Sequence, residues 1–266
     1  MTQLLVSVKN VSEALLALHA GADVIDMKDP SVGALGALST SEITTIVSAL
    51  RKQNPQVCIS ATIGDTHENV DAMQQAIMQT ASLGVDIVKF PLNGHTHDLK
   101  ALLGISTLLS VETEMAKPLS FKTEMAKPLT SKRVILFGVL FADIALDLDL
   151  IEAAAEAGLA GVMLDTQHKT QDLLCHANHA TLLNFVNRCK GNDLKSGLAG
   201  SLQVQYIENL VTLDPSYMGF RGGLCSHLNR NGDLDVNKLE MAKLLLHKGD
   251  NKVKISYENS GATLNC

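Results

Sequence analysis

Short apolar runs rich in β-branched residues alternate with longer segments of helical period along most of this 266-residue chain. Strands are expected at residues 4–8, 24–28, 57–62, 85–90, 133–142, 161–166 and 197–201, and residues 217–223 are expected to form the eighth strand with its loop. Helices are expected at residues 12–21, 39–52, 70–82, from about 98, 148–158, 180–189, 203–213 and 236–248. Strands that alternate with helices form parallel sheets, and eight such units in a chain of this length close into a barrel. We therefore predict an α/β fold, a single (β/α)8 TIM barrel over residues 1–248.

A tandem duplication interrupts the fourth unit. The sequence TEMAKPL of Thr113–Leu119 recurs as Thr123–Leu129. Two copies are too few for a stacked repeat architecture, and the proline in each copy opposes a continuous helix. We expect residues from about 113 to 131 to form a surface insertion on the N-terminal face of the barrel, and residues 249–266 to form a polar C-terminal tail.

Charge and composition narrow the class of partner. The net charge of -6 and the sequence pI of about 5.8 argue against a nucleic-acid or anionic membrane surface, although positive charge could still gather in one cleft. The most apolar run, Val134–Ala142, is too short to span a bilayer. Five cysteines without a C-x-x-C pair indicate reduced thiols, and the N-terminus has no signal-peptide pattern. We expect a soluble, cytoplasmic protein with a small phosphorylated substrate, no nucleic-acid or membrane partner, and assembly into a homo-oligomer.

The second expected strand places two charges within an apolar run, VIDMKDP at Val24–Pro30. Successive strand side chains face opposite ways, so Asp26 and Lys28 share one face, and Pro30 ends the strand. A partly desolvated lysine beside a carboxylate has the lowered pKa that Schiff-base chemistry needs. On this stretch alone, a lysine that extends its ammonium to solvent and pairs with Asp26 or Asp29 is an equal alternative.

Polar side chains end or follow most of the expected strands. They are Asp26, Lys28, Asp65, Lys89, Asp143, Asp165, Lys169, Ser201 and Arg221. A single charge of this kind is more often a solvated loop residue, but the C-terminal strand ends of a barrel converge on its active site. Neighbouring lysines also lower one another's pKa, which leaves a neutral amine available near neutral pH. We predict a catalytic set formed by Lys28, Lys89, Asp26, Asp165 and Lys169.

The loops after the last two strands are glycine-bearing and stand where barrels commonly bind phosphate through backbone N–H groups. The residues concerned are Gly200, Ser201, Arg221, Gly222 and Gly223. Arg221 is expected to add a fork of side-chain donors. A pair of tight turns without ligand is the alternative.

The cluster Cys175-His176-Ala177-Asn178-His179 is the main candidate for a metal site. Cysteine and histidine are zinc ligands, but His176 and His179 have no accompanying pattern such as H-E-x-x-H. No nucleophile elbow, Walker loop or dinucleotide fingerprint occurs in the sequence. We therefore predict no metal and no cofactor.

An ordered set of segments resembles the (5-formylfuran-3-yl)methyl phosphate synthase family, over roughly residues 4 to 248. They are Val24–Pro30, Ser60–Asp65, Val88-Lys89, Ala142-Asp143, Met163–Thr166 with Lys169, Leu198–Ser201 and Gly219–Gly222. The resemblance implies a role in methanofuran biosynthesis, with two molecules of glyceraldehyde 3-phosphate condensed into a furan aldehyde phosphate and one phosphate and water released. It also implies that Lys28 is the Schiff-base lysine and Lys89 the proton acceptor. The duplication, the tail and His168 beside Lys169 depart from the family pattern.

Three hypotheses follow. In the first, the protein is a cofactor-free, class I aldolase-like lyase, a carbon-oxygen lyase acting on phosphates, in which Lys28 forms an imine and Lys89 moves the proton that makes the enamine. Asp26 and Asp165 then orient the lysines and share acid/base duty. In the second, the protein is another phosphosugar aldolase or isomerase on the same barrel. In the third, it is a non-catalytic phospho-metabolite-binding protein, which needs no imine.

Overall fold

The computed structural model describes residues 1–92, 104 and 134–259 of the chain. Eight parallel strands close into a barrel in sequence order, with β8 paired to β1. The strands are β1 Gln3–Val8, β2 Val24–Met27, β3 Cys58–Thr62, β4 Ile87–Pro91, β5 Ile135–Phe141, β6 Gly161–Asp165, β7 Lys195–Leu198 and β8 Tyr217–Phe220. The predicted (β/α)8 barrel is thereby confirmed.

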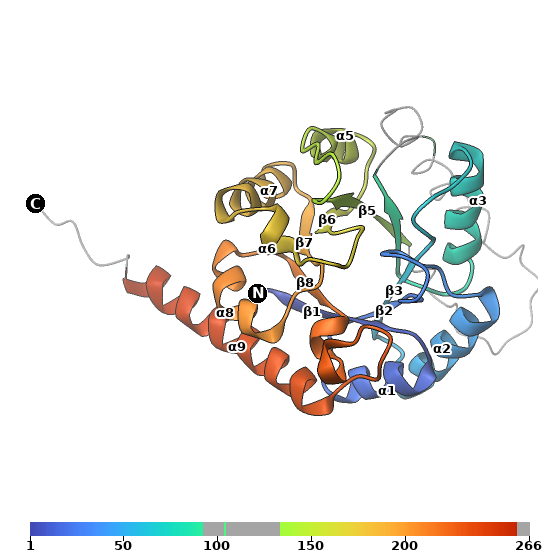
Figure 1. Cartoon of the computed structure of the whole chain (residues 1–266), viewed down its shortest axis with the longest axis horizontal. Coiled ribbons are helices and arrows are strands. Elements are labelled where there is room, and N and C mark those ends of the chain that lie inside the picture. The colour runs from blue at the N-terminus through green and yellow to red at the C-terminus, as the bar shows by residue number, and fades with distance from the viewer. Residues whose placement is uncertain (93–103, 105–133, 260–266) are drawn as a thin grey trace, which may run out of the picture.

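Helices form a ring around the barrel (Figure 1). The α-helices are α1 Val11–His19, α2 Thr40–Gln53, α3 Val70–Ala81, α5 Leu150–Glu156, α6 Leu173–His176, α7 His179–Gly191, α8 Ile207–Leu210 and α9 Val236–Asn259. Short 3-10 turns cover Val204–Tyr206, Val211–Leu213, Gly222–Leu224 and Ser226–Leu228. Sequence-encoded caps start several helices: the Ser39 hydroxyl and the Glu42 carboxylate form a capping box on α2. None of the helices in these described ranges has both the length and the apolar character needed to cross a membrane.

Alternation along the strands separates two apolar cores. On β1, Leu4, Val6 and Val8 belong to the large cluster between barrel and helices, whereas Leu5 belongs to a smaller cluster inside the barrel. The inner cluster also includes Met163. This side chain packs closely on β7, since a Cβ atom added to Gly197 would come within 2.6 Å of the Met163 Cγ atom. Apolar side chains therefore fill the barrel interior on the side of the N-terminal strand ends, as expected for this fold.

A polar layer lies above the inner apolar cluster. The strand register sets Ser7 opposite Asp26 and Asp26 opposite Ser60, and all three side chains are buried. Lys89 on β4 and Asp165 at the end of β6 are buried as well. Charges thus collect toward the C-terminal ends of the strands, which is the catalytic end of this fold.

The structure differs from the sequence expectation at three segments. Strand β7 ends at Leu198, so Gly200 and Ser201 lie in the loop. The helix expected at 203–213 is broken into α8 and flanking 3-10 turns, because this segment is rich in β-branched residues of low helix propensity. Helix α9 continues past Gly249 to Asn259, since one internal glycine costs a helix only about 1 kcal/mol.

Helix α9 thus continues beyond residue 248, the expected end of the barrel, and Figure 1 shows it running out beyond the ring of helices. Two other expectations cannot be compared with the structure. The helix from about residue 98 and the insertion at 113–131 lie outside the described residues.

Candidate active site

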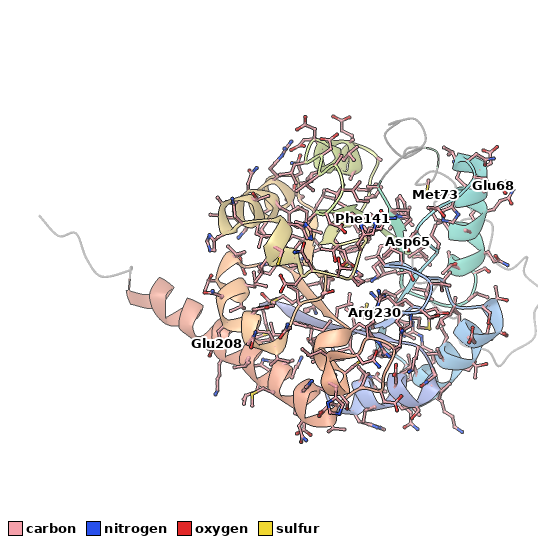
Figure 2. The ribbon with its side chains drawn as sticks, in the orientation of Figure 1. Asp65, Glu68, Met73, Phe141, Glu208 and Arg230 are labelled. Atoms are coloured by element: carbon pink, nitrogen blue, oxygen red, sulfur yellow. The ribbon has the colours of Figure 1, made fainter. Side chains whose placement is uncertain are left out.

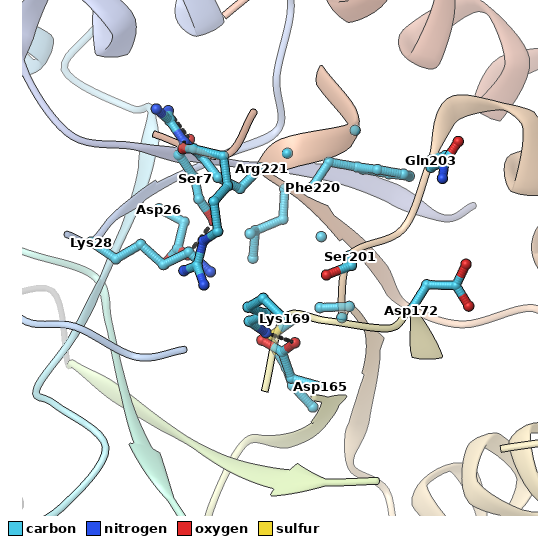
Figure 3. A pocket seen from close by; sticks show the side chains of 18 of the residues that line it. Ser7, Asp26, Lys28, Asp165, Lys169, Asp172, Ser201, Gln203, Phe220 and Arg221 are labelled. Carbon is cyan, nitrogen blue, oxygen red and sulfur yellow. Dashed lines mark hydrogen bonds and ion pairs between the residues drawn. The ribbon is translucent and has the colours of Figure 1, made fainter. Parts of the chain in front are cut away.

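A cavity of about 430 Å³ opens at the C-terminal ends of the strands. All five residues of the predicted catalytic set line it, as do the five predicted phosphate-site residues. Figure 3 shows Lys28 and Asp26 on one side of this cavity, Ser201 and Gln203 on the other, and Lys169 with Asp165 between them. The size is within the range of cavities that enclose small-molecule ligands.

Asp26 and Lys89 form a buried ion pair at the base of the cavity. The Lys89 Nζ atom lies 2.7 Å from Asp26 Oδ2, and the two side chains are only 5% and 0% exposed. The Ser7 and Ser60 hydroxyls donate to the same carboxylate at 3.0 and 2.6 Å. A buried charge needs an ion-pair partner and hydrogen bonds. These contacts supply both and hold the Lys89 side chain in a defined position beside the cavity.

Asp165 and Lys169 form a second pair. Lys169 Nζ donates to Asp165 Oδ1 at 2.6 Å and also to the carbonyl oxygen of Thr166. Burial favours the neutral carboxyl, but the Lys169 and Lys28 cations outweigh it and hold the pKa of Asp165 below its ordinary value. Asp165 is therefore an anion at neutral pH.

Lys28 differs from the other two lysines of the cavity. Its Nζ atom donates only to the Ala34 carbonyl oxygen, at 3.3 Å, and has no carboxylate partner within ion-pair distance among the described residues. Burial, with help from the Lys169 and Lys89 cations, lowers the pKa of Lys28 from 10.5 to about 8, against the opposing pull of Asp165 and Asp26. At pH 7.5 a pKa of about 8 leaves about a quarter of the amine neutral, against about one part in a thousand at the ordinary value.

Two other strand-end carboxylates organise loops instead of lining the cavity. Asp65 accepts from the Ala34 and Leu35 backbone N–H groups at 2.8 and 2.7 Å, which holds the loop after β2. Asp143 accepts from the N–H groups of Gln167 and His168 at 2.6 and 2.7 Å, which holds the loop after β6. The first loop carries Ala34, whose carbonyl oxygen accepts from Lys28, and the second carries Lys169. The two carboxylates therefore help to position these lysines by holding the loop backbone.

The loops after β7 and β8 present unpaired backbone donors. Gly200 and Ser201 have φ values of 101° and 51°, and the left-handed turn at Gly200 suits a residue without a Cβ. Within the described chain, the N–H groups of Gly200, Ser201, Gly222 and Gly223 donate to no other residue. Adjacent free N–H groups of this kind form an anion-binding concavity.

The Arg221 side chain has no donor left for the phosphate that the sequence assigns to it. Its guanidinium makes a bidentate pair with Glu13 and also donates to the carbonyl oxygens of Ser7, Arg230 and Gly232. All five N–H donors are therefore committed to the protein. A buried arginine needs a carboxylate partner, and α1 supplies one.

Arg230 is the cavity arginine that the sequence reasoning missed. It lines the cavity, and the one hydrogen bond that its side chain makes to another described residue runs from Nη2 to the Gly33 carbonyl oxygen at 2.8 Å. Arg230 lies well beyond the end of β8 at Phe220, so attention to residues directly after a strand overlooks it. The neighbouring asparagine and glycine in Asn229–Gly232 indicate a loop, but the loop's direction is not readable from the sequence.

The described residues contain no group of three or more His, Cys, Asp or Glu side chains placed to hold a metal ion. This includes His176 and His179, which occupy the ends of the separate helices α6 and α7. Cys175, Cys189 and Cys225 are free thiols.

Comparison with known proteins is consistent with this geometry. The family model described as 4-HFC-P synthase matches residues 4–243. The chain belongs to this family. A relative in Methylorubrum extorquens named "Putative (5-formylfuran-3-yl)methyl phosphate synthase" is 38% identical over 249 residues, which are 93% of this chain and 92% of the relative. The (5-formylfuran-3-yl)methyl phosphate synthase of Archaeoglobus fulgidus is 31% identical, over 84% of this chain and 90% of its own length.

Solved structures share the fold at low sequence identity. The 3-hexulose-6-phosphate synthase of Salmonella typhimurium superposes with a TM-score of 0.61 and 12% identity, covering 93% of this chain and 100% of that one. The phosphoribosylanthranilate isomerase of Thermotoga maritima gives 0.58 and 14%, covering 93% and 99%. At these identities the similarity establishes the barrel alone.

Proposed function

We propose that this protein is an enzyme, a (5-formylfuran-3-yl)methyl phosphate synthase of methanofuran biosynthesis that condenses two molecules of glyceraldehyde 3-phosphate through an imine on Lys28. Membership in the family supports the choice of product, because the relatives carry that name. The observation that carries the chemistry is the state of Lys28, an amine without an ion-pair partner among described residues and with a pKa lowered to about 8. Lys89 and Lys169, in contrast, are each held by a carboxylate.

The reaction begins when the neutral Lys28 amine attacks the carbonyl carbon of one triose phosphate, and loss of water gives the iminium ion. The iminium acidifies the neighbouring C–H. Lys89 passes its own proton to Asp26, whose Oδ2 atom lies 2.7 Å from Nζ, and the neutral Lys89 amine then takes the C–H proton to leave an enamine. The enamine carbon forms the new carbon–carbon bond with the second aldehyde. Elimination of one phosphate and a net loss of two molecules of water then yield the furan, and hydrolysis of the imine returns the Lys28 amine.

The remaining groups have binding and electrostatic tasks. Lys169, paired with Asp165, keeps positive charge beside Lys28 and so helps to hold its pKa down. The free N–H groups of Gly200 and Ser201 take a substrate phosphate. This chemistry needs no cofactor, and we place it in the cytoplasm, where the homo-oligomer expected from the sequence would operate.

The test incubates the protein with glyceraldehyde 3-phosphate, identifies the product by mass spectrometry and ultraviolet absorbance, and traps the imine with borohydride. We expect a furan aldehyde phosphate and one reduced adduct on the peptide that contains Lys28. Lys28→Arg is the matched variant, since it keeps the charge but cannot form an imine because guanidinium stays protonated.

Other outcomes separate the alternatives. A sugar phosphate without a furan chromophore, formed with a Lys28 adduct, would identify another phosphosugar aldolase. Binding without any adduct or turnover would identify a phospho-metabolite-binding protein. An adduct on Lys89 or Lys169 in place of Lys28 would contradict the assignment of the nucleophile.

A further inference from the structure

The Arg230 guanidinium is a half-buried cation with most of its donors uncommitted. Of its five N–H groups, one donates to Gly33, and no carboxylate among the described residues lies within ion-pair distance. Burial lowers the pKa of Arg230, although the Asp165 and Asp65 charges oppose this effect. Burying a cation without an anionic partner is costly, so the site is suited to a ligand that supplies one.

The backbone that carries Arg230 is held in place. Arg221 donates to the carbonyl oxygens of Arg230 and Gly232 at 2.7 and 2.8 Å, and Lys9 donates to that of Asn231 at 2.7 Å. Arg221 is itself fixed by Glu13 on α1. Three consecutive carbonyls are thus bound by two cations, which restricts the direction in which the Arg230 side chain leaves the loop.

Backbone strain next to this segment supports the same interpretation. His227 and Leu228 have φ values of 55° and 58°. This is a left-handed backbone conformation that residues other than glycine rarely adopt. Leu228 also lines the cavity. Strained residues persist where the surrounding structure determines them, and they gather at ligand-binding sites.

Arg230 and the free backbone donors occupy different sectors of the cavity. The Arg230 side chain leaves the loop after β8 and reaches Gly33 in the loop after β2, whereas Gly200 and Ser201 follow β7. The strand order around the barrel is β7, β8, β1, β2. Figure 2 shows Arg230 and Asp65 inside the ring of helices, with Glu68 and Glu208 nearer its periphery.

We propose that Arg230 forms a second anion subsite, which binds the phosphate of one triose phosphate while the N–H groups of Gly200 and Ser201, after β7, bind the phosphate of the other. Glu13 and Arg221 act as positioning residues for Arg230. The naming of the ligand rests on the proposed function, because that reaction brings two phosphates into one cavity. The existence of two anion subsites rests on the geometry alone.

The test compares two probes that have no carbonyl group and cannot form an imine: hexitol 1,6-bisphosphate, with phosphates spaced as on two joined trioses, and hexitol 6-phosphate. Their dissociation constants are measured by calorimetry for the full chain. The wild type should bind the bisphosphate at least about tenfold more tightly than the monophosphate, since charge-assisted hydrogen bonds to a second phosphate add to the first. Arg230→Gln should reduce this ratio to about one, and Arg230→Lys should keep part of it.

Arg188→Gln is the matched control, since Arg188 pairs with Glu152 on the outer helices and should leave the ratio unchanged. A merely structural role of Arg230, through its bond to Gly33, would weaken both probes equally and also reduce borohydride trapping of unphosphorylated glyceraldehyde on Lys28. Equal weakening, or a ratio that survives in Arg230→Gln, would overturn the proposal. Absence of any Lys28 adduct in the wild type would sink the proposed function instead, because the probe ratio does not depend on an imine.

Discussion

Replacing Lys28 by methionine should stabilise the protein at neutral pH while abolishing turnover. Methionine has a similar length but no charge, so the substitution removes a buried ammonium that has no carboxylate partner among the described residues. A pKa lowered from 10.5 to about 8 corresponds to about 2.5 units, or about 3 kcal/mol, by which the folded state disfavours the charged form. Lys28→Met should therefore raise the free energy of unfolding by about 3 kcal/mol near pH 7.

The sign follows from proton linkage. The unfolded chain holds the Lys28 proton up to a pKa of 10.5 and the folded chain only up to about 8, so the penalty is complete below about pH 8. As the pH rises from 8 toward 10.5, the folded protein releases the proton first, and the penalty declines to zero. The difference between variant and wild type should decline over the same window.

Urea unfolding of both proteins at several values between about pH 6.5 and pH 10 measures this difference. Lys52→Met, at an exposed position near the end of α2, controls for the loss of one positive charge. A difference between Lys28→Met and wild type that is constant with pH, or a variant less stable than wild type near pH 7, would refute the reasoning. Either result would mean that Lys28 is not a partly discharged buried amine.

Three further predictions concern the neighbours of Lys28. The rate of imine trapping should fall about tenfold per pH unit below pH 8. Asp165→Asn should shift this decline to lower pH, because Asp165 raises the pKa of Lys28. Trapping at a series of pH values checks both. Lys89→Ala should lose turnover but keep trapping on Lys28 above about pH 8, because Lys89 makes the smallest of the charge contributions to the amine's pKa; loss of trapping at that pH as well would show that Lys89 does more than move the proton. Arg221→Met should lower the free energy of unfolding by about 3–5 kcal/mol, and adding Glu13→Met should recover part of it in a denaturation series, whereas no recovery would mean that the pair is not the source.

The barrel and the convergence of its lysines were predictable because each depends on local patterns. Period-two and helical runs fix the strand and helix order, and parallel strands bring their C-terminal ends to one face. The inward direction of Asp26 follows from alternation on one strand. The lowered pKa of Lys28 follows from its burial and, to a smaller extent, from the neighbouring lysine cations. The Ser39 cap of α2 is equally local, since donor and acceptor are three residues apart.

Pairing between distant residues was not predictable from the same patterns. Glu13 fits the usual preference for an acidic residue in the first turn of a helix, so nothing in the sequence indicates that it takes the guanidinium of Arg221, 208 residues away. Without that partner Arg221 has the character of a phosphate ligand, whereas with it the free donors belong to Arg230. Residue type and position in the sequence indicate which side chains could bind a ligand. Contacts between distant residues decide which of those side chains still have free donors.

The ion pairs also show which cations of the cavity have no carboxylate partner within the described residues. Asp26 and Asp165 hold Lys89 and Lys169, and Arg221 is held by Glu13, so Lys28 and Arg230 stay without an ion pair in the described structure. A phosphate monoester brings about two negative charges, which would raise the pKa of a nearby amine and protonate it. Under the proposed function, a guanidinium bound to that phosphate would cancel part of its field, so that Arg230 would allow an anionic substrate to enter while Lys28 stays partly neutral. A cavity with Lys28 alone would attract such a substrate but would lose the proposed nucleophile on binding.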